Sequence, residues 1–201
     1  MTDRSTAPDV VATTRTWLEK AVIGLNLCPF AAPVHLHDRI RYFVSLADSP
    51  GMLLQDLLSE LRALDAADPN RCETTLLIHP NVLANFADYN DFLSQADDVV
   101  AELGLEGMFQ VASFHPHYQF AGTRADDIAN YTNRSPYPML HLLRESSVER
   151  AVMRYPDTTA IYKSNIETMR RLGHEGWRRL WLAQTPADSP QPARGAKKDS
   201  S

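Results

Sequence analysis

Two short apolar runs of the sequence end in histidine–proline pairs. They are Leu77–Pro80 and Ser113–His117. If both runs are parallel strands, their carboxyl ends lie along one edge of the sheet, where open α/β proteins place their ligand sites. We therefore expect His79, His115 and His117 to meet at that edge. Three imidazoles in one place make this edge the candidate site.

Three imidazoles support two kinds of chemistry. In an extended segment, His115 and His117 project to the same side and would present two nitrogens to a divalent transition metal such as Zn, Mn or Fe. His79, Asp126 or Asp127 would supply a third ligand and leave a position open for catalysis. Without a metal, the histidines would act as general acid and base, because imidazole titrates near neutral pH. A third interpretation is that they only bond nearby backbone and end their strands.

A polar, irregular segment follows the second histidine pair at residues 116–137. Long segments of this kind in compact domains tend to be binding loops. Arg124 and Arg134 would offer paired donors to a carboxylate or phosphate, which predicts a small anionic substrate. The alternative is that these arginines pair with aspartates of their own loop. The predicted substrate-binding residues are Arg124, Asn130, Tyr131, Asn133 and Arg134.

Cys28 is a further catalytic candidate, because a cysteine with a lowered pKa is a nucleophile. It stands at the expected C-terminal end of the first helix, where the helix dipole disfavours a thiolate. A buried structural thiol is therefore the alternative, and a cysteine-dependent enzyme is the third hypothesis for function. Of the other histidines, His35 and His37 are expected to face solvent, and His141 and His174 to be surface or capping residues on helices.

The balance of residue types excludes several classes of protein. The 201 residues are 44% hydrophobic and 22% charged, which rules out a disordered or fibrous chain. A net charge of -5 argues against a nucleic-acid partner. Two cysteines are too few for a secreted disulfide scaffold, so the cytoplasm is the expected compartment. No uninterrupted apolar stretch is long enough to span a membrane, and no glycine-rich nucleotide motif occurs.

Hydrophobic periodicity predicts an alternation of helices and strands. Helical spacing covers residues 8–27, 50–64 and 86–103, and strand patterns cover Ile40–Leu46, Thr74–His79 and Met108–Phe114. This order predicts an α/β fold: a small sheet of three or four strands, with helical crossovers that make neighbouring strands parallel. Val34–His37 is a candidate fourth strand at the edge. A hairpin there would give the alternative, an α+β, ferredoxin-like fold.

The part of the chain after the polar segment is predicted to be helical. A short helix is expected over Met139–Glu145, and a capping box of Ser146 and Glu149 opens the next. A longer helix is expected over Asp157–Leu172, because Gly173 is suited to ending it. The C-terminal part should therefore be a group of helices.

Trp177 and Trp181 belong to a final amphipathic turn. If they were exposed on a flat face, they would offer an apolar surface to a partner protein. A non-catalytic binding or assembly module is therefore the alternative function. The expected organisation is a disordered N-terminus at residues 1–8, one globular domain at 9–184 and a disordered polar tail at 185–201.

Four stretches carry a resemblance to a family of bacterial proteins known as domain of unknown function 1415. They are Leu25–Ala31, Thr74–Pro80, Phe109–Ala121 and Asn130–Pro138. The likeness covers residues 9–184 and implies a bacterial, soluble, single-domain protein. That family has no assigned reaction, so the resemblance implies no activity and no catalytic residues.

The leading hypothesis from the residues is a small cytoplasmic enzyme that acts on a small anionic metabolite. Its site would lie where the second and third strands end. If a metal is bound there, hydrolysis by metal-activated water is the simplest reaction. If none is bound, the histidines would act as acid and base. Nucleic acids and membranes are not expected partners.

Overall fold

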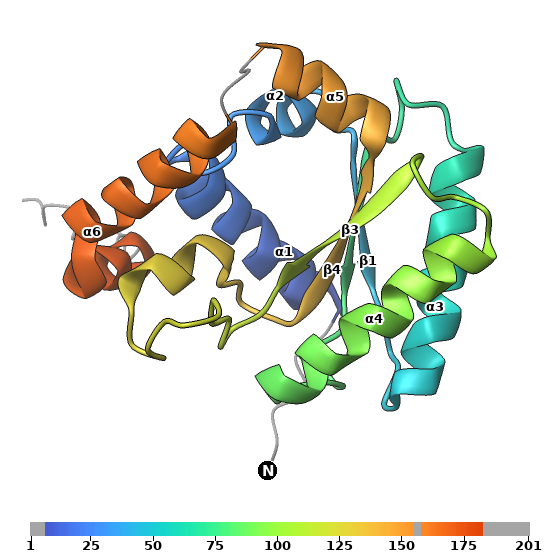
Figure 1. The fold of residues 1–201 in the computed structure, drawn as a ribbon, viewed down its shortest axis with the longest axis horizontal. Coiled ribbons are helices and arrows are strands. Elements are labelled where there is room, and N and C mark those ends of the chain that lie inside the picture. The colour runs from blue at the N-terminus through green and yellow to red at the C-terminus, as the bar shows by residue number, and fades with distance from the viewer. Residues whose placement is uncertain (1–6, 155–157, 183–201) are drawn as a thin grey trace, which may run out of the picture.

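A four-stranded mixed sheet runs through the middle of the molecule in the computed structural model, which describes residues 7–154 and 158–182 (Figure 1). Its strands are β1 (Ile40–Val44), β2 (Thr74–Ile78), β3 (Phe109–Phe114) and β4 (Met139–Arg144). The order across the sheet is β1-β2-β4-β3. β1 and β2 are parallel and β4 is antiparallel to both its neighbours, so β1, β2 and β3 point the same way. The predicted α/β class is confirmed.

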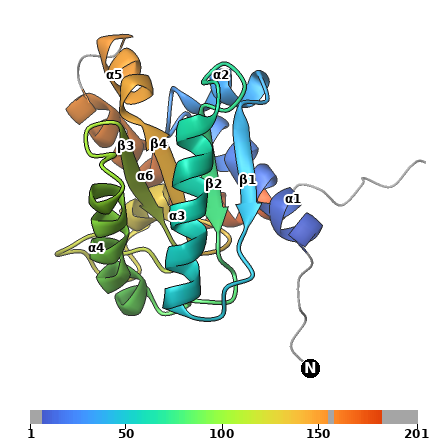
Figure 2. The same cartoon turned by 90° about the vertical axis from the view of Figure 1, so that its right-hand side faces the viewer.

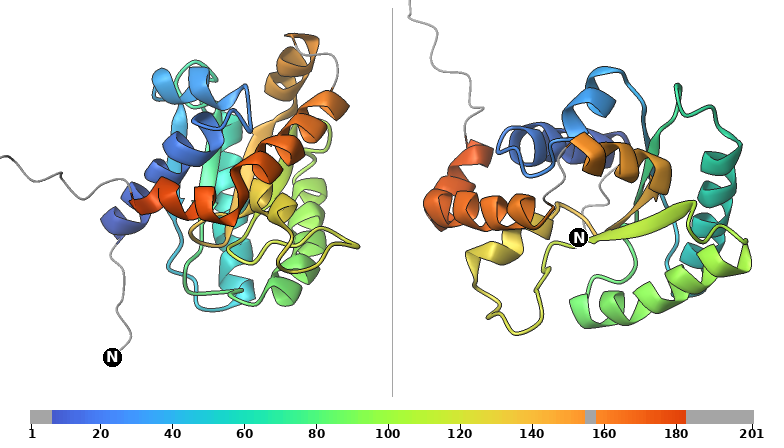
Figure 3. Two further views of the ribbon diagram at one scale, coloured as in Figure 1. Left: turned by 90° about the vertical axis from the view of Figure 1, so that its left-hand side faces the viewer. Right: turned by 45° about the horizontal axis from the view of Figure 1, so that its top comes forward.

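Helices cover both faces of the sheet. Figure 2 shows α3 (Pro50–Ala66) and α4 (Phe86–Glu102) lying across one face. The other face carries α1 (Ala7–Trp17), the π-helical segment η1 (Leu18–Ile23) and α6 (Thr158–Leu182) (Figure 3). The shorter helices are α2 (Ala31–Leu36), the 3-10 helix η2 (Ile128–Asn133) and α5 (Glu145–Arg154). Within the described ranges, no helix is both long and apolar enough to cross a membrane.

Two apolar clusters join these layers. The buried leucines of α3 are Leu53, Leu57, Leu61 and Leu64. They recur every three or four residues, so they form one face of the helix, and that face packs with Leu77 of β2 in the first cluster. The residues on either side of Leu77 face the opposite way and belong to the second cluster, with α1 and η1. β2 is thus buried on both faces, which explains its unbroken apolar run.

The predicted helix at Met139–Glu145 is wrong, because residues 139–144 form β4. Leu140 and Leu142 pack toward α3 and α4, whereas Met139 packs toward α1. A strand buried on both faces has a continuous apolar run, and a run this short carries no period that separates it from a helix. β4 is nevertheless the strand that lies between β2 and β3.

The predicted edge strand at Val34–His37 is also wrong, since α2 covers most of that segment. Leu36 is 79% exposed there, so the alternation of apolar and polar residues in this segment does not mark a buried strand face. The chain turns at Asp38, whose φ is 53°, and leads directly into β1. The hairpin on which the ferredoxin-like alternative depended is therefore not formed.

Helix ends follow the sequence pattern only in part. The first helical stretch ends at Ile23, earlier than predicted, whereas Gly173 interrupts α6 as expected, with a φ of 64°. The helix resumes after this glycine and continues to Leu182. α1 begins at Ala7, inside the predicted N-terminal tail. The rest of that tail and the predicted tail at 185–201 lie outside the described residues.

Candidate functional site

The carboxyl ends of β2 and β3 lie at the same edge of the sheet, on either side of the start of β4. The backbone N–H of His79 donates to the carbonyl of Pro138 at 3.0 Å. The backbone N–H of His115 donates to the carbonyl of Asn133 at 3.2 Å. Each histidine is therefore fixed to the returning chain one residue beyond its strand. This is the edge at which the sequence predicted the site.

Tyr89 of α4 stands between the two buried imidazoles. Its ring is stacked on that of His79, with centroids 5.8 Å apart and planes at 19°. Its centroid is 5.0 Å from that of His115. We call His79, Tyr89 and His115 the histidine cluster. His79 and His115 have no exposed surface, whereas His117 is exposed, with its ring centroid 5.9 Å from that of His115. The structure thus joins two of the predicted histidines inside the molecule and leaves the third at the surface.

The hydrogen bond of His79 determines its tautomer. Its Nδ1 lies 3.1 Å from the carbonyl oxygen of Val82, and because a carbonyl only accepts, Nδ1 carries the proton. Nε2 therefore holds a lone pair. This atom is buried and has no hydrogen-bond partner in the described part of the chain. Burial lowers the pKa of His79 to about 4, so the ring is uncharged at neutral pH.

His115 has no free nitrogen. Its Nε2 donates to the carbonyl of Leu83 at 3.1 Å, and its Nδ1 accepts the backbone N–H of His117 at 3.0 Å. Burial also lowers its pKa. The two imidazoles thus hold consecutive carbonyls of the segment 80–85, which joins β2 to α4. In this segment Leu83 has a φ of 58°, a conformation that a leucine rarely adopts and that costs about 1–3 kcal/mol.

Tyr89 is the member of the cluster that sequence reasoning missed. Its hydroxyl donates to the carbonyl of Met139 at 2.8 Å and accepts the N–H of Phe114 at 3.1 Å, so it bridges β3 and β4 where they separate. Burial raises its pKa, which keeps the hydroxyl protonated. In the sequence it belonged to an apolar helical stripe. The available signal was that a buried tyrosine needs a partner for its hydroxyl.

The predicted metal ligands do not form a metal-binding group in the described part of the chain. Among residues 7–154 and 158–182, no three His, Cys, Asp or Glu side chains form a group that could hold a metal ion. Both nitrogens of His115 are already bonded. Asp126 is bonded to Arg124 at 3.0 Å, and Asp127 accepts the N–H of Ala129 at 2.9 Å at the start of η2.

The predicted anion-binding arginines have other partners. Arg134 donates from Nε to the carbonyl of Tyr118 at 3.3 Å and from Nη2 to that of Ala125 at 2.7 Å. Its guanidinium also lies 4.1 Å from the ring centroid of Tyr131. The side chain of Arg124 is 87% exposed and forms its ion pair at the surface. Arg134 therefore shapes the loop, and Arg124 is the arginine of the pair that faces solvent.

The two asparagines also fold the loop. Asn130 is fully buried; its amide donates to the carbonyl of Arg124 at 2.8 Å, and its oxygen accepts the N–H of Phe120 at 3.0 Å. The amide of Asn133 donates to the carbonyl of Ser113 at 3.3 Å. These contacts explain why a segment rich in polar side chains adopts one conformation beside the strand ends.

Cys28 is not placed as predicted. The first helical stretch ends at Ile23, and Cys28 precedes α2, where its carbonyl accepts the N–H of Ala31 at 3.2 Å. The backbone N–H groups of Phe30 and Ala31 lower the pKa of the thiol, but burial raises it by more, so the net shift is upward. The thiol is therefore protonated at neutral pH.

His141 lies on β4 and is not a surface or capping residue of a helix, as the sequence suggested. Its Nε2 donates to the hydroxyl of Thr74 at 2.7 Å, and that hydroxyl donates to the carbonyl of Leu142 at 2.6 Å. Burial of the imidazole lowers its pKa to about 4. His174 is exposed on α6, where its ring packs against Tyr131.

Comparison with known proteins gives a family and no activity. No curated protein and no solved structure matches the chain. One family model, described as a protein of unknown function (DUF1415), matches residues 9–179. This span includes the whole sheet and every residue of the histidine cluster. The chain therefore belongs to the DUF1415 family.

Proposed function

We propose that this protein is a small enzyme that removes a proton from a small anionic metabolite, with Nε2 of His79 as the base. One observation carries the proposal: Nε2 is a buried lone pair with no partner in the described chain, and its tautomer is set by the Val82 carbonyl. Buried polar groups are almost always bonded, so an exception calls for a physical or functional reason. A substrate proton that Nε2 takes up would supply such a reason.

The charge of the substrate follows from the pKa of the base. With a pKa of about 4, free His79 is uncharged at neutral pH and is a weak base. An anion bound beside Nε2 would raise that pKa, because it stabilises the imidazolium that forms when the proton is taken. The Val82 carbonyl and the stacked ring of Tyr89 would stabilise the same cation. Metal-activated hydrolysis is not part of this proposal.

Access to Nε2 requires the segment 80–85 to move. The imidazoles hold this segment through two carbonyls, and the conformation of Leu83 offsets part of that stabilisation. Diethyl pyrocarbonate, which acylates unprotonated imidazole nitrogens, tests the access. We expect mass spectrometry to find His79 modified, more slowly than exposed His117, in protein that stays folded by circular dichroism. If His79 is untouched when His117 is fully modified, the proposal fails.

Turnover is tested with a panel of small carboxylates and phosphates that carry an acidic C–H, followed by NMR for deuterium uptake from D₂O. Replacing the base, as in His79→Gln, should lower exchange of an active compound by about a hundredfold or more. His141→Gln is the matched control, since it removes another imidazole whose pKa is about 4. The control should retain activity. Equal losses in both variants would overturn the role of His79.

The alternative function, a binding or assembly module, has less support. Trp177 is partly buried and packs against the second apolar cluster, with its ring centroid 5.3 Å from that of Tyr131. Trp181 is 37% exposed and meets Trp177 edge to face. Both indoles thus make contacts within the protein, and the two do not form one flat exposed face.

A further inference from the structure

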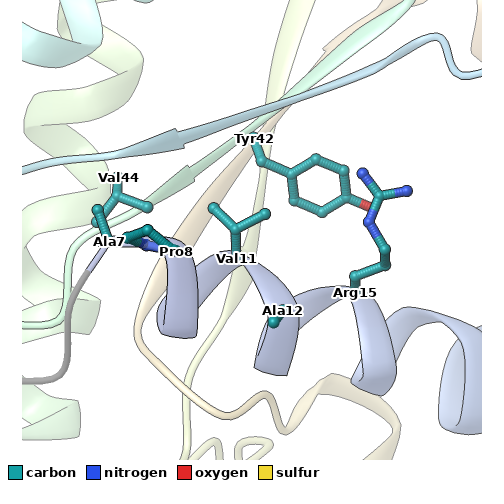
Figure 4. A pocket seen from close by; sticks show the side chains of 7 residues that line it. All are labelled: Ala7, Pro8, Val11, Ala12, Arg15, Tyr42 and Val44. Atoms are coloured by element: carbon teal, nitrogen blue, oxygen red, sulfur yellow. The ribbon is translucent and has the colours of Figure 1, made fainter.

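An open groove lies between α1 and β1, one of the two edge strands of the sheet (Figure 4). Its volume is about 640 Å³, within the range of small-molecule sites. The lining residues are Ala7, Pro8, Val11, Ala12, Arg15, Tyr42 and Val44. None of them belongs to the histidine cluster. The groove is therefore a separate feature, and a proposal about it can fail independently of the proposed function.

The groove is lined by one stripe of a helix and one stripe of a strand. Residues 8, 11, 12 and 15 follow the three- and four-residue spacing of a single helical face. Tyr42 and Val44 are two residues apart on β1 and so point to the same side. From Ala7 to Arg15 the helix rises about 12 Å, at 1.5 Å per residue. The groove is thus elongated, open to solvent and mostly apolar.

One end of the groove is polar. The guanidinium of Arg15 lies 4.9 Å from the ring centroid of Tyr42 and forms no ion pair with a carboxylate in the described chain. Glu19, one turn further on, is 3.2 Å from Nε2 of His35. The Tyr42 hydroxyl is buried and has no hydrogen-bond partner among the described residues. Figure 4 shows this hydroxyl beside the guanidinium, with Val44, Ala7 and Pro8 at the other end.

The Tyr42 hydroxyl is available as a donor. Burial raises its pKa, and this outweighs the opposite effect of Arg15, so the phenol keeps its proton at neutral pH. A cation and a hydroxyl donor side by side are matched by one anionic group with two acceptor oxygens. A singly charged carboxylate suits this pair, because one cation and one hydroxyl are the polar groups of a lining that is otherwise apolar.

We propose that the groove binds a medium-chain aliphatic carboxylate. The carboxylate accepts hydrogen bonds from Arg15 and the Tyr42 hydroxyl. The alkyl chain lies along Val11 toward Val44 and Pro8. The polar end sets the direction of the ligand, and the length of the apolar stripe sets the length of its chain.

The test is a titration of the ¹⁵N-labelled full chain with octanoate, followed by heteronuclear NMR. We expect saturable shifts in residues 7–15 and 42–44. Butanoate should bind more weakly, by about two- to fourfold for each methylene removed. Octylamine, with the same chain and the opposite charge, should not produce these shifts. Shifts that are absent, that lie elsewhere or that octylamine reproduces would overturn the proposal.

Variants of the polar end measure its role. Arg15→Gln should weaken octanoate binding at least tenfold, and Arg15→Lys should restore part of it, because the charge returns. Tyr42→Phe should weaken binding about three- to tenfold by removing the hydroxyl while keeping the ring. Unchanged affinity in Arg15→Gln contradicts the proposal, provided that its thermal unfolding matches that of the original protein.

A matched pair of variants tests the groove itself. Ala12 and Thr13 are neighbouring exposed residues of α1, but only Ala12 lines the groove. Ala12→Phe should fill the groove and abolish octanoate binding, whereas Thr13→Phe should leave the affinity unchanged. Equal affinity in these two variants would place the binding of octanoate elsewhere on the molecule.

Discussion

The two ends of β2 each adjoin an uncharged imidazole, and the two imidazoles differ in how their nitrogens are bonded and in how deeply they are buried. At the amino end, Nε2 of His141 is bonded to Thr74, whose hydroxyl continues the chain of bonds to a carbonyl. At the carboxyl end, Nε2 of His79 has no partner in the described chain. Burial lowers both pKa values to about 4. A depressed pKa is therefore common to both ends, and what distinguishes the candidate site is that the unpartnered nitrogen of His79 is fully buried.

The largest expected effect is a loss of stability in acid at both ends. A histidine with a pKa of about 4 in the folded state and 6.5 in the unfolded chain stabilises the fold fully above pH 6.5. As the pH falls below 6.5, the unfolded chain binds the proton first, and stability drops by about 1.4 kcal/mol per pH unit for each histidine. Urea unfolding at pH 6.5 and 5.0 should show a loss of roughly 2 kcal/mol from each, with His115 adding in the same direction.

Single variants assign this loss to the two ends. His79→Gln and His141→Gln should each remove about a third to a half of the loss in the free energy of unfolding between pH 6.5 and 5.0. An unchanged pH dependence in one variant would show that the imidazole it removes does not titrate as the structure implies.

The next effect concerns the residue that supports the carboxyl end. Tyr89→Phe should lower the free energy of unfolding by about 2–3 kcal/mol, because the carbonyl of Met139 and the N–H of Phe114 both lose their partner. Tyr131→Phe is the control: it removes the hydroxyl of a tyrosine that is only partly buried, and should change stability by less than about 0.5 kcal/mol. Similar values for the two variants in urea unfolding would contradict the bridging role of Tyr89.

The smallest effect is expected at the amino end. Thr74→Val keeps the shape of the side chain but removes the hydroxyl between His141 and the Leu142 carbonyl. We expect a loss of about 1–2 kcal/mol in urea unfolding, and no change in the diethyl pyrocarbonate reactivity of His79. A change in that reactivity would mean that the two ends of β2 are coupled.

Sequence patterns predicted the parts of the fold that one periodicity describes. α3 and α4 each bury one apolar stripe and expose the opposite face, and apolar and polar residues tend to alternate along β1. These patterns made it predictable that the three segments are two helices and a strand. β4 was missed because it is buried on both faces and its apolar run has no diagnostic period. The edge where His79 and His115 stand followed from the shared direction of β2 and β3.

The roles of the loop side chains were less predictable. Arg134 and Asn130 have the residue types of a ligand site, yet their donors reach carbonyls of their own loop. A sequence pattern shows which groups can donate, but the folded loop determines which acceptors lie within reach. The same limit applies to Cys28, whose surroundings changed once the first helix ended before it.

By itself, the sequence of this protein determined the helical stripes, the strand-ending histidines and the membership of its family. Tertiary structure decided which nitrogen of which histidine is free, because the partners of each ring come from other segments, such as Val82 for His79 and Thr74 for His141. It also created the groove, where Arg15 and Tyr42 meet only because α1 packs beside β1. Hydrogen bonds and burial depend on distances in space, and local residue order does not specify those distances.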